Sequence, residues 1–269
     1  MNDFKVLVDE MKIRGFSRKT ISRYTYLNQR FLDFIKKSPK DVCKADVESY
    51  LVYLYDRNLS SATRHLVRAA LKFYYEYILK RKFNLAYPKK SNKLPVVLSK
   101  EEILGMIGSV KNQKHRLLLM LMCGSGLRVG EAIKAKIGDF DISSKTLHVK
   151  SGKGNKDRIV NLSERFISGF AKFVNANPNG FLFESSQRPG SHISSRTAQL
   201  IIKNTLRKTR INKNVHPHTL RTSFATHLIE NDTDISYVQK LLGHSSISTT
   251  QTYLRLSKSS IRSVKSPLD

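Results

Sequence analysis

Apolar residues recur at intervals of three and four along most of this 269-residue chain. Such spacing places them on one face of an α-helix, so the pattern predicts a mainly α-helical protein. The pattern is lost over residues 83–98, where prolines, lysines, serine and asparagine gather instead. That composition is typical of a basic, semi-extended linker. We therefore expect two folded domains, at 1–82 and 99–269, joined by the linker 83–98.

The first domain is expected to contain four amphipathic helices joined by short turns. Residues 2–14 form the first, and Ser17 is a plausible N-cap for the second. Pro39 marks a break before the third, and Ser60 is the expected cap of the fourth. Aromatic residues on these helices could stack on nucleic-acid bases, but their helical spacing favours packing in a core.

The second domain is predicted to be mainly α with a small β element. Ser99 and Glu102 have the spacing of a capping box, which would start its first helix. Between Lys145 and Leu162 apolar residues alternate on two arms around a glycine-containing loop, which predicts a β-hairpin. Helices are expected at 99–109, 114–122, 163–175, 194–209, 218–230, 234–242 and 248–256.

The charge of the chain indicates a polyanionic partner. Lys and Arg total 48 against 21 acidic residues, which gives a formal net charge of +27. Residues 1–90 carry 20 basic and 9 acidic residues, so the excess is shared by both domains rather than placed in one tail. Nucleic acid or an anionic membrane surface would suit such a chain. No apolar run approaches the 20 or so residues that span a bilayer, so we expect a cytoplasmic protein that does not enter the membrane.

Six residues of the second domain combine cationic side chains with one phenol. Taken singly, each has a structural explanation: Arg128 could pair with Glu131, a Lys-Gly turn is common, and His244 follows the glycine that would end a helix. Taken together, cations can stabilise a phosphodiester under nucleophilic attack, and a tyrosine can hold the phosphoryl group covalently. The six are Arg128, Lys153, His218, Arg221, His244 and Tyr253.

Other kinds of site lack support. The glycines around Arg128 match neither a dinucleotide-binding fingerprint nor a P-loop. A zinc pair of His216 and His218 has no cysteine or HExxH pattern beside it. The two cysteines, Cys43 and Cys123, lie in apolar stretches and are expected to be buried. We expect no metal and no cofactor.

Four segments resemble the tyrosine recombinase family, which includes phage integrases and Xer proteins. They are GLRVGE at 126–131, SGKGNKDR at 151–158, HTLRTSFATHL at 218–228 and LGHSSISTTQTYL at 242–254. The resemblance implies a helical SAM-like core-binding domain followed by a catalytic domain. It implies catalytic roles for the six residues, with Lys153 on a β-turn and Tyr253 as the nucleophile. Thr222 departs from the family pattern, which often has a second histidine there.

The resemblance also implies a reaction and an assembly. A 3′-phosphotyrosyl intermediate would form on double-stranded DNA at a specific recombination site, within a homotetramer built from protein that is a monomer or dimer when free. The compact layout looks Xer-like, which suggests resolution of chromosome or plasmid dimers. Three alternatives stay open: an integrase or excisionase of a mobile element, a type IB topoisomerase-like enzyme, and a non-enzymatic DNA-binding protein.

Overall fold

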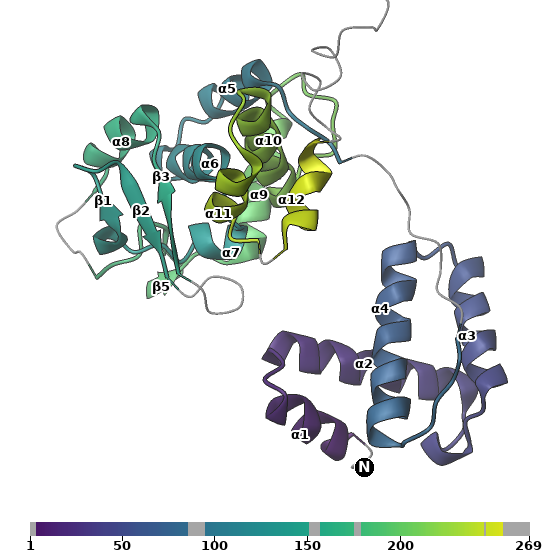
Figure 1. Cartoon of the computed structure of the whole chain (residues 1–269). Helices are drawn as coiled ribbons and strands as arrows, with labels where there is room; N and C mark the ends of the chain where they lie inside the picture. Colours follow the sequence, from purple (N-terminus) through teal and green to yellow (C-terminus); the bar gives the residue numbers. More distant parts are fainter. Residues whose placement is uncertain (1–3, 86–94, 151–156, 175–178, 245, 255–269) are drawn as a thin grey trace, which may run out of the picture. The chain divides into compact units, whose positions relative to one another are not determined.

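The computed structural model describes residues 4–85, 95–150, 157–174, 179–244 and 246–254. The chain divides into two compact units, residues 1–93 and 94–269 (Figure 1). Helices dominate both units, and the only sheets seen in the described ranges are small ones in the second unit. The prediction of a mainly α-helical protein is thus confirmed.

The first unit is an all-helical bundle. Two of its helices begin where the sequence predicted, because Ser17 accepts a hydrogen bond from the Thr20 N–H and Ser60 accepts one from the Thr63 N–H, each at 3.2 Å. Its elements are α1 (Lys5–Ile13), α2 (Arg18–Ile35), the short 3-10 helix η1 (Pro39–Asp41), α3 (Lys44–Asp56), α4 (Ser61–Lys72) and the π-helical turn η2 (Phe73–Ile78).

Aromatic rings fill the core of this first unit. The Phe31 ring is fully buried and lies 5.2 Å from the Tyr50 ring and 6.1 Å from the Tyr75 ring, centroid to centroid. Edge and tilted contacts of this kind stabilise aromatic clusters. The prediction that these rings pack in a core is confirmed for this group. Cys43, by contrast, is exposed at the start of α3, so its expected burial was wrong, whereas Cys123 is buried.

The second unit is built around α6, whose stretch from residue 117 to residue 123 is apolar on every side. Residues 117–119 and 121–122 of this helix are fully buried, and α5, α8, α9 and α10 pack against it (Figure 1). The helices of this unit are α5 (Lys100–Gly108), α6 (Gln113–Ser125), α7 (Val129–Ala132), η3 (Ile137–Asp139), α8 (Glu164–Ala171), α9 (Ser195–Leu206), α10 (Pro217–Glu230), α11 (Ile235–Leu242) and α12 (Ile247–Leu254). The capping box of Ser99 and Glu102 is present at α5.

The β-hairpin predicted between Lys145 and Leu162 has its two arms in the structure. Strands β2 (Thr146–Val149) and β3 (Arg158–Asn161) are antiparallel, and β1 (Phe140–Asp141) extends them to a three-stranded sheet. Leu147 and Val160 pair across the two arms and are buried, whereas Ile159 is 62% exposed. A second hairpin, β4 (Glu184–Ser185) with β5 (Arg188–His192), was not predicted. No helix among the described residues is long and apolar enough to cross a membrane.

Candidate active site

Arg128 is placed by a glycine turn between two helices. Gly126 ends α6 in the left-handed conformation, with φ at +60°. A Cβ at this position would lie 2.3 Å from a ring carbon of Phe224, so only glycine fits. Two residues later Arg128 is the N-cap of α7. Since α7 has only four residues, Arg128 depends on its side-chain partners rather than on a long helix for its position.

The partner of Arg128 is Glu131, a carboxylate shared with a second arginine. Arg128 donates from Nη1 to Glu131 Oε1 at 2.8 Å, and its backbone N–H donates to Oε2 at 2.8 Å. Arg158, the first residue of β3, donates to both oxygens, from Nη1 at 3.0 Å and from Nη2 at 2.7 Å. Burial alone would raise the pKa of Glu131, but the hydrogen bonds from Arg158 and from the Arg128 N–H outweigh it and lower the pKa to about 2.

Arg221 lies between the C-terminal ends of two helices. It extends from α10, is 2% exposed, and donates from Nη1 to the Gly126 carbonyl at 2.8 Å and from Nη2 to the Leu242 carbonyl at 2.6 Å. These carbonyls belong to the ends of α6 and α11, where helix dipoles favour a cation. Burial, and then the nearby Arg128, lower the pKa of Arg221 to about 10, so its guanidinium stays charged at neutral pH.

His218 stands one turn before Arg221 on the same helix. Its side chain is exposed, and His216, the N-cap of α10, precedes it with the two rings 6.4 Å apart. Partial desolvation lowers the pKa of His218, and the charges of Arg221, His216 and Arg128 lower it further. A neutral imidazole at this position can accept a proton at physiological pH.

His244 and Tyr253 lie together at the end of the described chain. The two rings are nearly parallel, with centroids 6.1 Å apart. His244 Nδ1 lies 2.9 Å from the Thr250 hydroxyl, and when that hydroxyl donates, the Nε2 of His244 carries its proton. Burial, followed by the charges of Arg221 and Arg128, lowers the pKa of His244 to about 4, so the ring is neutral at pH 7.

Tyr253 lies at the boundary between an apolar cluster and the cationic residues. It is 5% exposed and belongs to a cluster with Ala225, Ile229, Val238 and Leu242. It is also close enough to Arg221 for its charged form to raise the pKa of that arginine. The ring is thus fixed by packing in this cluster and lies beside the His244 ring, and Leu242 of the same cluster accepts the hydrogen bond from Arg221 Nη2.

Five of the six predicted residues come together, and they do so from three separate segments. Arg128 follows α6, His218 and Arg221 belong to α10, and His244 and Tyr253 follow α11. The Arg128 Nη2 lies 3.4 Å from the Gly243 carbonyl, next to His244. Lys153 lies outside the described residues.

Two side chains of this site were not given a role from the sequence. From the sequence, Glu131 is expected only as a partner of Arg128 at the start of a helix, and Arg158 is only one letter of the motif at 151–158. An acid three residues after the arginine was the available signal for Glu131. Nothing in the sequence pointed to Arg158, because its partners lie 27 and 83 residues away.

Comparison with known proteins identifies the family of this chain. Residues 97–260 match the model of the phage integrase family, and residues 4–85 match the phage integrase N-terminal SAM-like domain. The chain is 33% identical over 267 residues to a putative integrase/recombinase, y4qK, of Sinorhizobium fredii, covering 97% of this chain and 86% of that protein. It is 31% identical over 258 residues to the tyrosine recombinase XerA of Pyrococcus horikoshii, covering 94% and 88%.

A solved structure extends the likeness to three dimensions. The XerH site-specific recombinase, in a post-cleavage complex with a palindromic difH substrate, superposes with a TM-score of 0.72 and 26% identity over 97% of this chain and 83% of that one. The family model matches more than half of the chain, and the relatives cover nearly all of it. The chain therefore belongs to the phage integrase family of tyrosine recombinases.

Proposed function

We propose that this chain is a site-specific DNA recombinase that cuts and rejoins duplex DNA through a 3′-phosphotyrosyl intermediate. The observation that carries the proposal is the convergence of Arg128, Arg221 and His244 beside the phenol of Tyr253. Two guanidinium groups and a neutral N–H donor suit a phosphate that gains negative charge during displacement. Relatives named as tyrosine recombinases, of nearly the same length, support the assignment.

The mechanism is an in-line displacement at phosphorus. Arg128, Arg221 and His244 hold the nonbridging oxygens while the oxygen of Tyr253 attacks and the 5′ oxygen of the next nucleotide leaves. His218 assists by moving the proton of the phenol, and Lys153 protonates the leaving oxygen. The product is a tyrosyl ester at the 3′ end and a free 5′-hydroxyl. Because the new phosphodiester is about as energetic as the old one, a 5′-hydroxyl from another duplex can reverse the step without ATP.

The assembly we propose is a homotetramer on two duplexes, since exchange of both strand pairs needs four cleavages. Residues 1–82 would serve as the core-binding domain and 99–269 as the catalytic domain, with 83–98 as the linker. The similarity to XerA over 94% of the chain supports an Xer-like enzyme, and we propose that its role is to resolve chromosome or plasmid dimers. Resolution by this route requires two defined sites and no cofactor.

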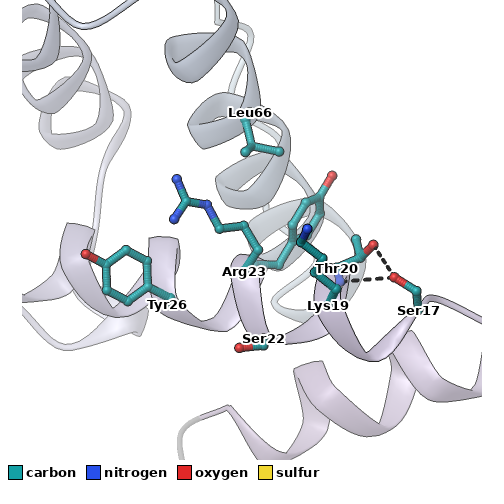
Figure 2. A pocket seen from close by; sticks show the side chains of 8 residues that line it. Ser17, Lys19, Thr20, Ser22, Arg23, Tyr26 and Leu66 are labelled. Atoms are coloured by element: carbon teal, nitrogen blue, oxygen red, sulfur yellow. Dashed lines mark hydrogen bonds between the residues drawn. The ribbon is translucent and has the colours of Figure 1, made fainter. Parts of the chain in front are cut away.

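The first unit offers a basic surface for the duplex on α2. A hollow of about 670 Å³ there is lined by Lys19, Arg23 and Tyr26 of α2 and by Leu66 of α4 (Figure 2). Figure 2 shows Ser17 bonded to Thr20 at the start of the helix. Lys19 and Arg23 are exposed, and the Arg23 guanidinium lies 5.5 Å from the centre of the Tyr26 ring. Cations one turn apart on an exposed helix suit successive phosphates of a DNA strand.

We expect a double variant, Lys19→Ala with Arg23→Ala, to bind duplex DNA more weakly and with a shallower dependence on salt. Loss of two phosphate contacts should reduce the slope of log K against log [salt] by about 2. Fluorescence anisotropy across a salt series measures the slope. The matched control, Lys5→Ala with Lys44→Ala, removes the same charge from exposed positions on α1 and α3 and should keep the wild-type slope. If the α2 variant kept the wild-type slope, as the control should, α2 would not be part of the DNA interface.

Trapping on nicked duplexes tests the function itself. When the duplex carries a nick beside the scissile phosphate, the short fragment that bears the free 5′-hydroxyl diffuses away after cleavage. The strand then cannot be rejoined, so the covalent adduct accumulates and runs as a shifted band on a denaturing gel. A library of such duplexes would also identify the target site. Exchange between two defined sites supports the recombinase, and relaxation of supercoils without site preference would favour a topoisomerase. A protein that binds DNA but yields no adduct on any duplex would be a non-enzymatic binder.

A further inference from the structure

Arg158 is a strand residue whose side chain contacts two other elements of the candidate site. Its side chain is 9% exposed, and it donates from Nε to the Leu241 carbonyl at 2.8 Å as well as forming the two bonds to Glu131. All three guanidinium nitrogens are thus directed at protein acceptors. This arrangement holds Arg158 firmly against Glu131 and the end of α11, beside the residues proposed to bind the phosphate.

We propose that Arg158 is a positioning residue that keeps Arg128 available for the phosphate. The proposal rests on the recombinase function proposed above. A carboxylate beside a single arginine favours the bidentate fork, in which both nitrogens of the guanidinium are used. Here Arg158 occupies that fork on Glu131, and the guanidinium of Arg128 supplies only Nη1 to the carboxylate.

The charge balance supports the same conclusion. Arg128, Glu131 and Arg158 together carry one net positive charge, whereas Arg128 and Glu131 alone would be neutral. Since the Glu131 side chain is only 9% exposed, water screens this difference weakly. Arg158 therefore leaves the site with the positive charge that a scissile phosphate requires.

Arg158 also connects three segments that carry other site residues. It starts β3, five residues after Lys153 in the sequence, and it contacts α7 through Glu131 and the end of α11 through Leu241. A Cβ on Gly243 would lie 3.0 Å from the Arg158 Cδ, which shows how closely the arginine packs against the residue before His244. Displacing Arg158 would move the neighbours of both Arg128 and His244.

The test compares Arg158→Ala, Arg158→Lys and the double variant Arg158→Ala with Glu131→Gln. Single-turnover adduct formation on a saturating nicked duplex should be roughly 10- to 100-fold slower for both single variants, with the DNA dissociation constant nearly unchanged. Arg165→Lys, at an exposed position on α8, is the matched control and should cleave like the wild type. Rates are taken per folded molecule, with the folded fraction measured by circular dichroism.

The double variant separates positioning from stability. Without the negative charge of Glu131, Arg128 is no longer captured, so Arg158→Ala with Glu131→Gln should cleave faster than Arg158→Ala although it folds no more stably. A double variant that is no faster, or single variants with wild-type rates per folded molecule, would overturn the proposal.

A measurement independent of cleavage distinguishes failure of this proposal from failure of the recombinase assignment. In a crystal structure of DNA-free Arg158→Ala, Glu131 should bond two guanidinium nitrogens of Arg128 instead of Nη1 alone. Arg128 unchanged from the wild type would refute the positioning role whatever the enzyme does. A wild-type protein that forms no adduct would refute the function, and the crystallographic result would still decide what Arg158 does to Arg128.

Discussion

A Tyr253→Phe variant is expected to bind duplex DNA as the wild type does and to form no covalent adduct with it. The change removes one oxygen from a ring that packs against Val238 and Leu242, so the fold of α12 should be kept. Because the phenolic oxygen is the proposed nucleophile, its loss should lower the rate of strand cleavage by at least about 10⁴-fold, as for other covalent catalysts. A denaturing gel of the nicked-duplex reaction gives the rate, and anisotropy gives the affinity.

The control for this experiment is Tyr237→Phe. Tyr237 is on α11, close in sequence to the site, but it is 62% exposed and its ring contacts the Lys240 ammonium instead of the site. Its variant should form the adduct at the wild-type rate. An adduct in the Tyr253→Phe reaction, or its loss only in the Tyr237→Phe reaction, would assign the nucleophile elsewhere.

Local patterns predicted most of the elements that carry the site. Capping side chains at Ser17, Ser60 and Ser99 fixed the starts of helices, because each bonds to a backbone N–H three residues later. The alternation of Leu147 and Val149 predicted β2 for the same local reason. The two-residue strands β1 and β4 were missed, since a segment that short has no periodicity to detect.

Contacts between distant segments could not be predicted in this way. Arg221 bonds to the carbonyl of Gly126, 95 residues away, and Arg158 bonds to the carbonyl of Leu241, 83 residues away. No spacing rule connects such residues, because the packing of α6, α10 and α11 brings them together. The resemblance to a family identified Arg221 as a site residue, whereas the contacts of Arg158 can be identified only from the three-dimensional structure.

Glu131 should make the stability of the second unit depend strongly on pH. Its pKa is about 2 in the folded state, against an ordinary value of 4.5. A carboxyl group whose pKa is lowered by folding stabilises the folded state at pH values above its ordinary pKa. That stabilisation is lost as the pH falls from about 4.5 through about 2. The shift corresponds to about 3 kcal/mol, and the side chain is only 9% exposed, so solvent screening reduces it little.

A Glu131→Gln variant tests this dependence. At pH 7 its free energy of unfolding should be about 3 kcal/mol below that of the wild type, because two guanidinium groups lose their shared carboxylate. At pH 2 the gap should nearly vanish, since a protonated Glu131 has the same charge as glutamine. Urea unfolding followed by circular dichroism, on the transition of the unit that contains α5 to α12, gives both values.

Glu164→Gln is the matched control, because Glu164 pairs with Lys145 on the surface of the same unit and its side chain is 75% exposed. Exposed pairs contribute about 1 kcal/mol or less, so this variant should follow the wild type at every pH. A gap for Glu131→Gln that is as large at pH 2 as at pH 7 would show that glutamine disturbs packing rather than charge. A gap below about 1 kcal/mol at pH 7 would show that Arg128 and Arg158 do not depend on the carboxylate, and Arg158 could not then act through it.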